Sequence, residues 1–341
     1  MSEKILKIEN LEVLFPSDMG VIRAVEGIDL EIEKGSCVAL VGESGCGKSV
    51  TSLATMKLLG GTKAQVHADV MELCGKDIRS LSDKEMQSMR GKNISMIFQD
   101  ALCALNPVMT VGRQLDEIFI RHMKMSKKEA KLHSVEALKL VGVPDPAARY
   151  HSYPHELSGG MRQRVLIAMA FACQPDLIIA DEPTTALDVT IQAQVLHVLS
   201  ELQKQHKTAL LLITHDLSVV LHMADVINVM YSGKIVEKAR TKELFLEPLH
   251  PYTKGLIQSV PKMEDEKGEF VQIPDTLPNP IHKPKGCYFC PRCSCAMKKC
   301  QEQMPPLIQV GDGRQVRCWL YQKREDGVPA DYEKQVSIVN R

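Results

Sequence analysis

The sequence predicts an α/β fold built on a parallel sheet. Apolar runs over residues 36–41 and 177–180 have the length and composition of strands buried on both faces. Two further core strands are expected over 209–213 and 226–230, and an amphipathic helix over 191–205 separates the second core strand from the third. The length of 341 residues allows two domains with a substantial core.

Two subdomains are expected to accompany this sheet. Residues 5–13 and 28–32 alternate in polarity as half-buried strands do, so the chain up to about Gln99 is expected to form an antiparallel β subdomain and the first part of the core. From about residue 100 to 173 the pattern is helical, as over 127–141. An α-helical subdomain is therefore expected as an insertion in the core.

A phosphate-binding motif follows the first core strand. The residues that match G-x-x-x-x-G-K-[ST] are Gly42, Glu43, Ser44, Gly45, Cys46, Gly47, Lys48 and Ser49. Glycines let backbone N–H groups and the start of the next helix approach an anion closely. In this motif Lys48 reaches the β- and γ-phosphates and Ser49 ligates Mg²⁺. The sequence thus predicts a P-loop NTPase core in which these residues and Val50 bind ATP.

An acidic pair, Asp181 and Glu182, ends the second core strand. Side chains alternate in direction along a strand and its exit, so the two carboxylates can serve different partners. Asp181 is expected to reach the Mg²⁺ shell, and Glu182 to act as the base for an attacking water. Without the upstream loop, such a pair would more simply be a solvated turn.

The ordered motifs resemble the ATP-binding cassette family of ATPases. The positions that carry this resemblance, beyond the phosphate loop and the acidic pair, are Phe15, Gln99, Ser158, Gly159, Gly160, Asp188 and His215. The resemblance implies a RecA-like P-loop core with an antiparallel β subdomain and an inserted α-helical subdomain. It also implies an ATPase that uses ATP and Mg²⁺.

In that family, the nucleotide lies between two cassettes that face each other. The resemblance implies that the signature, Ser158 to Gly160, and Asp188 of the D-loop act in trans on the nucleotide of the other cassette. Gln99 would join Ser49 and Asp181 around Mg²⁺, and His215 would orient the water and the γ-phosphate. Phe15 matches the aromatic that stacks on adenine, although a strand aromatic packed in a core has the same pattern.

The C-terminal part has a different composition. Six of the eleven cysteines lie between Cys287 and Cys318. The prolines Pro274, Pro278, Pro280, Pro284 and Pro291 favour an extended connector. In a reducing cytosol such cysteines are expected to bind metal rather than form disulfides. The expected division is a nucleotide-binding domain over residues 1–255 and an extension over 256–341.

Residues 249–253 and 286–319 resemble the C-terminal extension of the oligopeptide and dipeptide importer ATPases. This resemblance implies a [4Fe–4S] cluster, and the matching positions are Cys287, Cys293, Cys300 and Cys318. Cys290 and Cys295 depart from the pattern, and the Cys-x2-Cys spacings that Cys290 creates would equally suit Zn²⁺. Iron–sulfur, zinc and the absence of a metal are therefore all open at this point.

Composition limits the possible functions. The chain has 42 basic and 42 acidic residues, a net charge of +0, and gives no sign of nucleic-acid binding. It begins without a signal-peptide pattern and lacks an apolar run near ~20 residues, the length that spans a bilayer. A peripheral position on the cytoplasmic side of the cell membrane is expected, reached by docking on other subunits.

The subfamily resemblance implies the ATP-hydrolysing subunit of an importer for di- or oligopeptides. The implied partners are a second ATPase subunit forming a heterodimer, two transmembrane permease subunits and an extracytoplasmic peptide-binding protein. Importers of nickel, other metal chelates or glutathione-like substrates would have nearly the same sequence. A non-transport cassette ATPase is a further alternative, but the chain lacks the long heptad insertion, second cassette or basic patch that would favour it.

Overall fold

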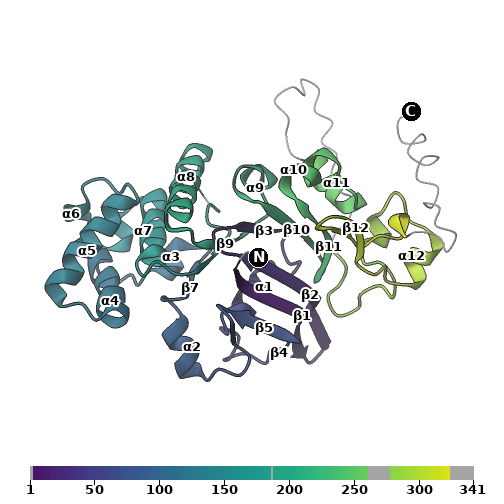
Figure 1. Cartoon of the computed structure of the whole chain (residues 1–341), viewed down its shortest axis with the longest axis horizontal. Helices are drawn as coiled ribbons and strands as arrows, with labels where there is room; N and C mark the ends of the chain where they lie inside the picture. Colours follow the sequence, from purple (N-terminus) through teal and green to yellow (C-terminus); the bar gives the residue numbers. More distant parts are fainter. Residues whose placement is uncertain (1–2, 186, 260–276, 323–341) are drawn as a thin grey trace.

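A computed structural model describes residues 3–185, 187–259 and 277–322 of the chain. It confirms the α/β class, with an eight-stranded mixed sheet at the centre (Figure 1). The strand order of this sheet is β12-β13-β11-β10-β3-β9-β8-β7. The bounds are β3 Cys37–Val41, β7 Ile94–Ile97, β8 Leu177–Asp181, β9 Ala209–Thr214, β10 Val226–Tyr231, β11 Lys234–Arg240, β12 Ile308–Gly311 and β13 Arg314–Val316.

The central strands β10, β3, β9, β8 and β7 pair in parallel. Along β3, Ala39 and Val41 belong to one hydrophobic cluster, whereas Val38 and Leu40 belong to another. Each face of the sheet is thus covered by its own core, which is why β3 is an unbroken apolar run instead of an alternating one. Loops that leave the carboxyl ends of these strands share one edge of the sheet, where ligands of such folds bind.

A second sheet is antiparallel and packs against one face of the core. Its strands are β1 Lys4–Ser17, β2 Gly20–Glu33, β4 Gln65–His67, β5 Val70–Leu73 and β6 Lys76–Asp77. The alternation predicted over residues 5–13 and 28–32 lies within β1 and β2. Their buried side chains, such as Leu6, Ile8 and Leu30, join the cluster that contains Leu40.

Helices surround the sheets, and Figure 1 shows α4, α5 and α7 grouped at the end of the molecule opposite α12. The described helices are α1 Lys48–Thr55, α2 Asp83–Met89, α3 Ala101–Ala104, α4 Val111–Met123, α5 Lys127–Leu140, α6 Pro146–Arg149, α7 Gly159–Phe171, α8 Val189–His206, α9 Leu217–Met223, α10 Thr241–Leu246, α11 Pro251–Gln258 and α12 Lys298–Glu302. Three short 3-10 helices are Pro154–Glu156, Cys290–Arg292 and Trp319–Tyr321. Within the described ranges, no helix combines the length and apolar character that a membrane crossing requires.

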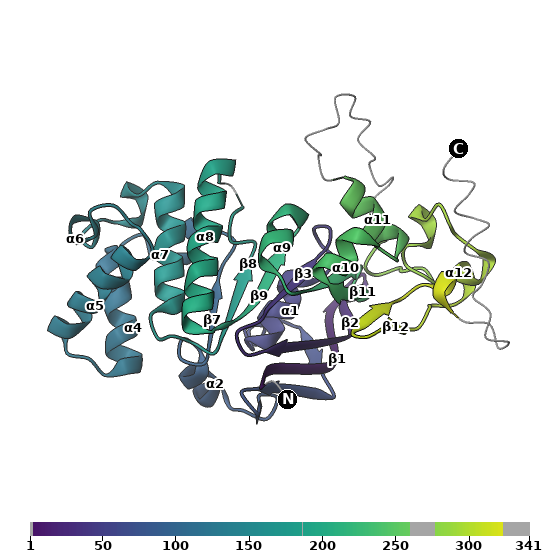
Figure 2. The same cartoon turned by 45° about the horizontal axis from the view of Figure 1, so that its top comes forward.

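The C-terminal segment 277–322 folds back onto the core, as both cartoon views show (Figures 1 and 2). Its strand β13 pairs with β11 and so extends the central sheet. Pro278, Pro280 and Pro284 lie outside helices and strands, as a connector requires, while Pro274 falls outside the described residues. For Pro291 the prediction is wrong, because this proline lies in the 3-10 helix Cys290–Arg292, whose first turn tolerates a residue without an N–H. The expected boundary between residues 255 and 256 lies inside α11.

A buried carboxylate ties the start of α11 to the sheet. Glu237 of β11 is 0% exposed and accepts hydrogen bonds from the backbone N–H groups of Leu249, at 2.9 Å, and His250, at 2.8 Å. Burial raises the pKa of this carboxyl, because the interior disfavours the charged form.

The Glu237→Gln variant tests this buried titration. A raised pKa means that folded Glu237 keeps its proton at pH values where the unfolded chain has lost it. The free energy of unfolding therefore falls as pH rises above about 4.3, the usual pKa of an unperturbed glutamate. Urea unfolding at successive pH values should show this fall in the wild type and a smaller one in Glu237→Gln. Identical pH profiles for the two proteins would contradict the assignment.

Candidate active site

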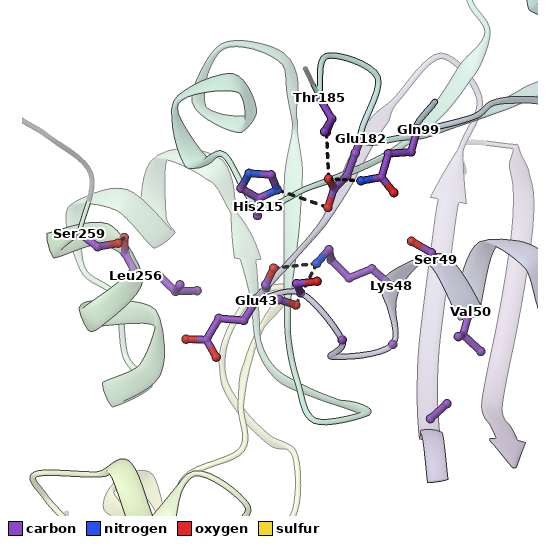
Figure 3. Close-up of a pocket in the computed structure, with 15 residues that line it drawn as sticks. Glu43, Lys48, Ser49, Val50, Gln99, Glu182, Thr185, His215, Leu256 and Ser259 are labelled. Atoms are coloured by element: carbon purple, nitrogen blue, oxygen red, sulfur yellow. Dashed lines mark hydrogen bonds and ion pairs between the residues drawn. The ribbon is translucent and has the colours of Figure 1, made fainter. Parts of the chain in front are cut away.

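A cavity of about 810 Å³ opens at the carboxyl end of β3 (Figure 3). Most of the phosphate-loop residues line it, together with Gln99, Glu182 and His215. These three come from the ends of β7, β8 and β9, strands that lie side by side in the sheet. The structure thus brings together residues that are up to 235 positions apart, from Ala24 to Ser259.

The loop between β3 and α1 has the tight backbone that its glycines permit. Gly47 has a φ of 111°, and a Cβ atom there would clash with the backbone oxygen of Ala24. Lys48, 4% exposed, donates from Nζ to the carbonyl oxygens of Gly42, at 2.7 Å, and Glu43, at 3.0 Å. Its ammonium is thus held across the mouth of the loop, where a phosphate anion would meet it.

Ser49 and Asp181 form the oxygen pair expected near a magnesium ion. The Ser49 hydroxyl donates to Asp181 Oδ1 at 3.0 Å, across from α1 to the end of β8. Asp181 is 5% exposed, and burial raises the pKa of its carboxyl, although the Ser49 hydrogen bond acts in the opposite direction. A buried carboxylate beside a hydroxyl is a donor set of the hard oxygen type that Mg²⁺ prefers.

Glu182 is held in place by three side chains (Figure 3). Its Oε2 accepts from Gln99 Nε2 at 3.0 Å and from the Thr185 hydroxyl at 2.9 Å, and its Oε1 lies 3.3 Å from His215 Nδ1. The backbone of Glu182 has a φ of 46°, in the left-handed region that non-glycine residues rarely adopt. Such backbone strain is typical of functional positions, and here it aims the carboxylate into the cavity.

The signature and D-loop residues lie apart from this cavity and beside each other. Ser158 caps α7 by accepting from the Met161 N–H, and Asp188 caps α8 by accepting from the Ile191 N–H. A Cβ atom on Gly160 would clash with Ile191, so the two helix starts are in close contact. None of Ser158, Gly159, Gly160 or Asp188 lines the cavity of the same chain.

Three predicted ATP-site residues, Phe15, Cys46 and Asp181, do not line this cavity, and several residues that do line it were missed. Phe15 is half-buried on β1 against the second core cluster, and Cys46 is 1% exposed. The cavity is lined in addition by Ala24, Thr185, Leu256 and Ser259, which the sequence motifs did not indicate. Thr185 lies three positions after Glu182, and its hydroxyl was a signal that could have placed it in the site. Leu256 and Ser259 lie at the end of α11 and belong to no sequence motif, so no signal in the sequence pointed to them.

The cysteines of the extension converge on one small cavity. This cavity, of about 10 Å³, is lined by Cys287, Cys290, Cys293, Cys295, Cys300 and Cys318. Burial raises the pKa of Cys287 to about 11 and of Cys293 and Cys318 to about 12, which favours the thiol over the thiolate. Over the described ranges, no three histidine, cysteine or acidic side chains are arranged to hold a metal ion. The donor chemistry suits a metal, but the spacing in this structure does not.

The fold and the cavity define a P-loop ATPase of the cassette type, and comparisons with known proteins agree. The family model for the ABC transporter matches residues 25–185, and the model for the oligopeptide/dipeptide transporter C-terminal region matches residues 236–300. The chain therefore belongs to the ABC transporter family, as the motifs predicted, and it is an ATPase.

Relatives match over nearly the whole chain. The dipeptide transport ATP-binding protein DppD of Bacillus subtilis is 49% identical, and the match covers 95% of this chain and 97% of the relative. OppD of the same organism, an oligopeptide transport ATP-binding protein, is 49% identical over 93% of this chain and 89% of its own length. DppD of Escherichia coli is 44% identical, and the match covers 92% of this chain and 96% of the relative.

Solved structures match the cassette. The ATP-binding cassette MJ0796, in a dimeric post-hydrolysis state bound to ADP and Pi, is 26% identical with a TM-score of 0.61, covering 69% of this chain and 98% of that one. CbiO1 from Clostridium perfringens, part of the ABC transporter complex cbiONQ, is 27% identical with a TM-score of 0.60. This match covers 72% of this chain and 92% of CbiO1.

Glu182→Gln should abolish hydrolysis while leaving nucleotide binding intact. The amide keeps the shape of the side chain but cannot take a proton from water, so turnover should fall by roughly 100- to 10,000-fold. Calorimetric titration with ATP should give a dissociation constant near that of the wild type. Glu201→Gln, an exposed acid on α8, serves as the control with normal turnover. Wild-type turnover in Glu182→Gln would remove Glu182 from the role of base.

Proposed function

We propose that this chain hydrolyses ATP to drive the uptake of di- or oligopeptides through partner membrane subunits. The observation that carries the proposal is the phosphate-loop cavity with its held carboxylate, in a chain that also has the oligopeptide/dipeptide transporter C-terminal region. Relatives at 44% to 49% identity carry the names of dipeptide and oligopeptide transport ATP-binding proteins. Importers of nickel, metal chelates or glutathione-like substrates are less favoured, because none of the relatives named above bears such a name.

In the proposed reaction, the phosphates of ATP bind at the N–H groups of the loop, and Lys48 neutralises charge on the β- and γ-phosphates. Ser49, Asp181 and Gln99 would hold Mg²⁺, which supplies charge neutralisation when it is bound. Glu182 takes a proton from water, the water oxygen bonds to the γ-phosphorus, and the bond from that phosphorus to the bridging oxygen breaks to leave ADP and phosphate. His215, whose Nδ1 lies 3.3 Å from Glu182 Oε1, orients the carboxylate and the water.

The proposed site is completed by a second cassette. Ser158 and Asp188 cap two adjacent helix starts, and Gly159 and Gly160 are the first residues of α7. None of the four lines the cavity of its own chain. A helix start offers free N–H groups that suit a γ-phosphate. We assign these residues to the nucleotide of the partner cassette in a heterodimer. Two permease subunits and an extracytoplasmic peptide-binding protein complete the proposed importer, in which the chain is peripheral on the cytoplasmic side.

Ser158→Arg tests this assignment. The arginine adds bulk and charge at the start of α7, away from the chain's own cavity, so the isolated chain should bind ATP normally. In the assembled pair hydrolysis should fall by roughly 100-fold or more, the cost of one misplaced transition-state contact. Lys127→Arg at the exposed start of α5 is a control for added bulk on this subdomain. Unchanged hydrolysis in the assembled Ser158→Arg pair would contradict the two-cassette site.

The proposed domains are a nucleotide-binding domain over residues 1–255 and an extension over 256–341. We further propose that Cys287, Cys293, Cys300 and Cys318 bind a [4Fe–4S] cluster, with Zn²⁺ as the alternative. What supports this is the convergence of six cysteines on one cavity. Binding would require these thiols to lose their protons and move closer together, because thiolate is the ligating form.

Metal analysis tests the proposed cluster. Protein purified without oxygen should contain iron and sulfide in a cluster ratio, with both lost in Cys293→Ser and retained in Cys173→Ser, a cysteine far along the chain from the extension. Zinc without sulfide would favour the alternative ligand. No metal in any preparation would overturn the proposal.

Uptake assays in the cell that produces the chain test the transport function. Deleting the chain should abolish uptake of labelled dipeptides or longer peptides, and the wild type but not Glu182→Gln should restore it. Loss of nickel or glutathione uptake with normal peptide uptake would favour the alternatives. Normal uptake of all these substrates would overturn the importer proposal.

A further inference from the structure

An ion pair joins the C-terminal extension to the phosphate loop. Arg292, from the 3-10 helix Cys290–Arg292, donates to both carboxylate oxygens of Glu43, at 2.7 Å and 2.9 Å. The side chain of Arg292 is 4% exposed and that of Glu43 is 26% exposed. Since Glu43 lines the nucleotide cavity, a residue of the extension directly contacts a wall of that cavity.

Arg292 is itself fixed by aromatic side chains. Its guanidinium lies 5.8 Å from the centre of the Tyr231 ring and donates to the Tyr231 hydroxyl at 3.3 Å. Tyr231 in turn packs edge-on against Tyr252 and Phe289, with ring centres 4.7 Å and 5.2 Å apart. The guanidinium is therefore held in one orientation, with its fork toward Glu43.

The backbone of Glu43 is held as firmly as its side chain. Its N–H donates to the Tyr252 hydroxyl at 2.9 Å, and its carbonyl oxygen accepts from Lys48 Nζ at 3.0 Å. Displacement of Glu43 would thus also displace the contact that holds the lysine of the loop. The position of Glu43 is coupled by direct hydrogen bonds both to the extension and to the phosphate-binding ammonium.

Charge gives this pair a role beyond packing. Glu43 places a carboxylate in a cavity that is proposed to bind the polyphosphate of ATP. The carboxylate and the phosphates are both negative, and they repel each other strongly where water is partly excluded. A buried ion pair is by itself a weak source of stability compared with apolar side chains of the same volume. A pair at this position has a clear use, however, because the Arg292 cation cancels the Glu43 charge.

We infer that Arg292 is a positioning residue for nucleotide binding, which neutralises Glu43 and holds it away from the phosphates. The inference rests on the proposed nucleotide function of the cavity. It makes the affinity for ATP dependent on the fold of the cysteine-containing extension.

The test compares dissociation constants for MgATP, measured by titration of the purified full-length chain. Arg292→Met should raise the constant by about tenfold, within the usual range of coupling between sites, because Glu43 is left as an uncompensated charge. Adding Glu43→Gln to Arg292→Met should bring the constant back to within about twofold of the wild type, because the variant removes the carboxylate charge and keeps the backbone contacts of residue 43 with Tyr252 and Lys48. A purely structural role of Arg292 would not produce this recovery.

Lys283→Met is the matched control. Lys283 is a second buried cation of the extension: its side chain is 7% exposed, lies 2.6 Å from Glu26, and contacts no phosphate-loop residue in the described hydrogen bonds. Its loss should lower the melting temperature but keep the dissociation constant within about twofold of the wild type. If Arg292→Met does not fold, Arg292→Gln takes its place with the same expectation.

Three results would overturn the inference: wild-type affinity in the folded Arg292 variant, an equal loss of affinity in Lys283→Met, or no recovery in the double variant. A wild-type chain that fails to bind MgATP would instead contradict the proposed function. The two failures are therefore distinguishable in one set of titrations.

Discussion

The parallel pairing of β3 with β9 and of β9 with β8 determines where the chemistry of this molecule lies. In parallel strands the carboxyl ends meet at one edge, so the residues that follow them are brought together regardless of their separation in the chain. Lys48 follows β3, Glu182 follows β8 and His215 follows β9. The two hydrophobic clusters that cover the faces of the sheet fix this register, because a slip of one residue would exchange the faces of every side chain.

Strain and polar contacts near this edge concentrate on a few groups. Glu182 has a left-handed backbone and three side-chain partners, and Asp181 is almost buried. Such arrangements lower the number of conformations open to a reactive group before substrate arrives, at the expense of local stability. The surrounding core of fully buried strands, including Leu40 and Leu211, supplies the rigidity that keeps these groups in place.

The sequence was sufficient to predict those elements that a few neighbouring residues determine. The apolar run of β3, the glycines before Lys48 and the acidic end of β8 are each specified within a few neighbouring residues. The contact between Arg292 and Glu43 joins positions 249 apart, and the packing of Leu256 beside the cavity depends on where α11 docks. Neither follows from periodicity or motif spacing. The four expected cysteine ligands line one small cavity, but their arrangement within the described residues does not form a metal site, because it depends on tertiary contacts that no motif encodes.

The pairing of β13 with β11 changes which strand forms the edge of the central sheet. Without it, β11 would present a row of unpaired backbone groups to solvent, a template for association with other chains. The outermost strand is instead β12, which is only 4 residues long and largely exposed. Short edge strands of this kind resist such association. The extension thus covers the edge of β11 that would otherwise be unpaired. We expect protein lacking the extension to self-associate through this exposed edge strand, even if every nucleotide-binding group is intact.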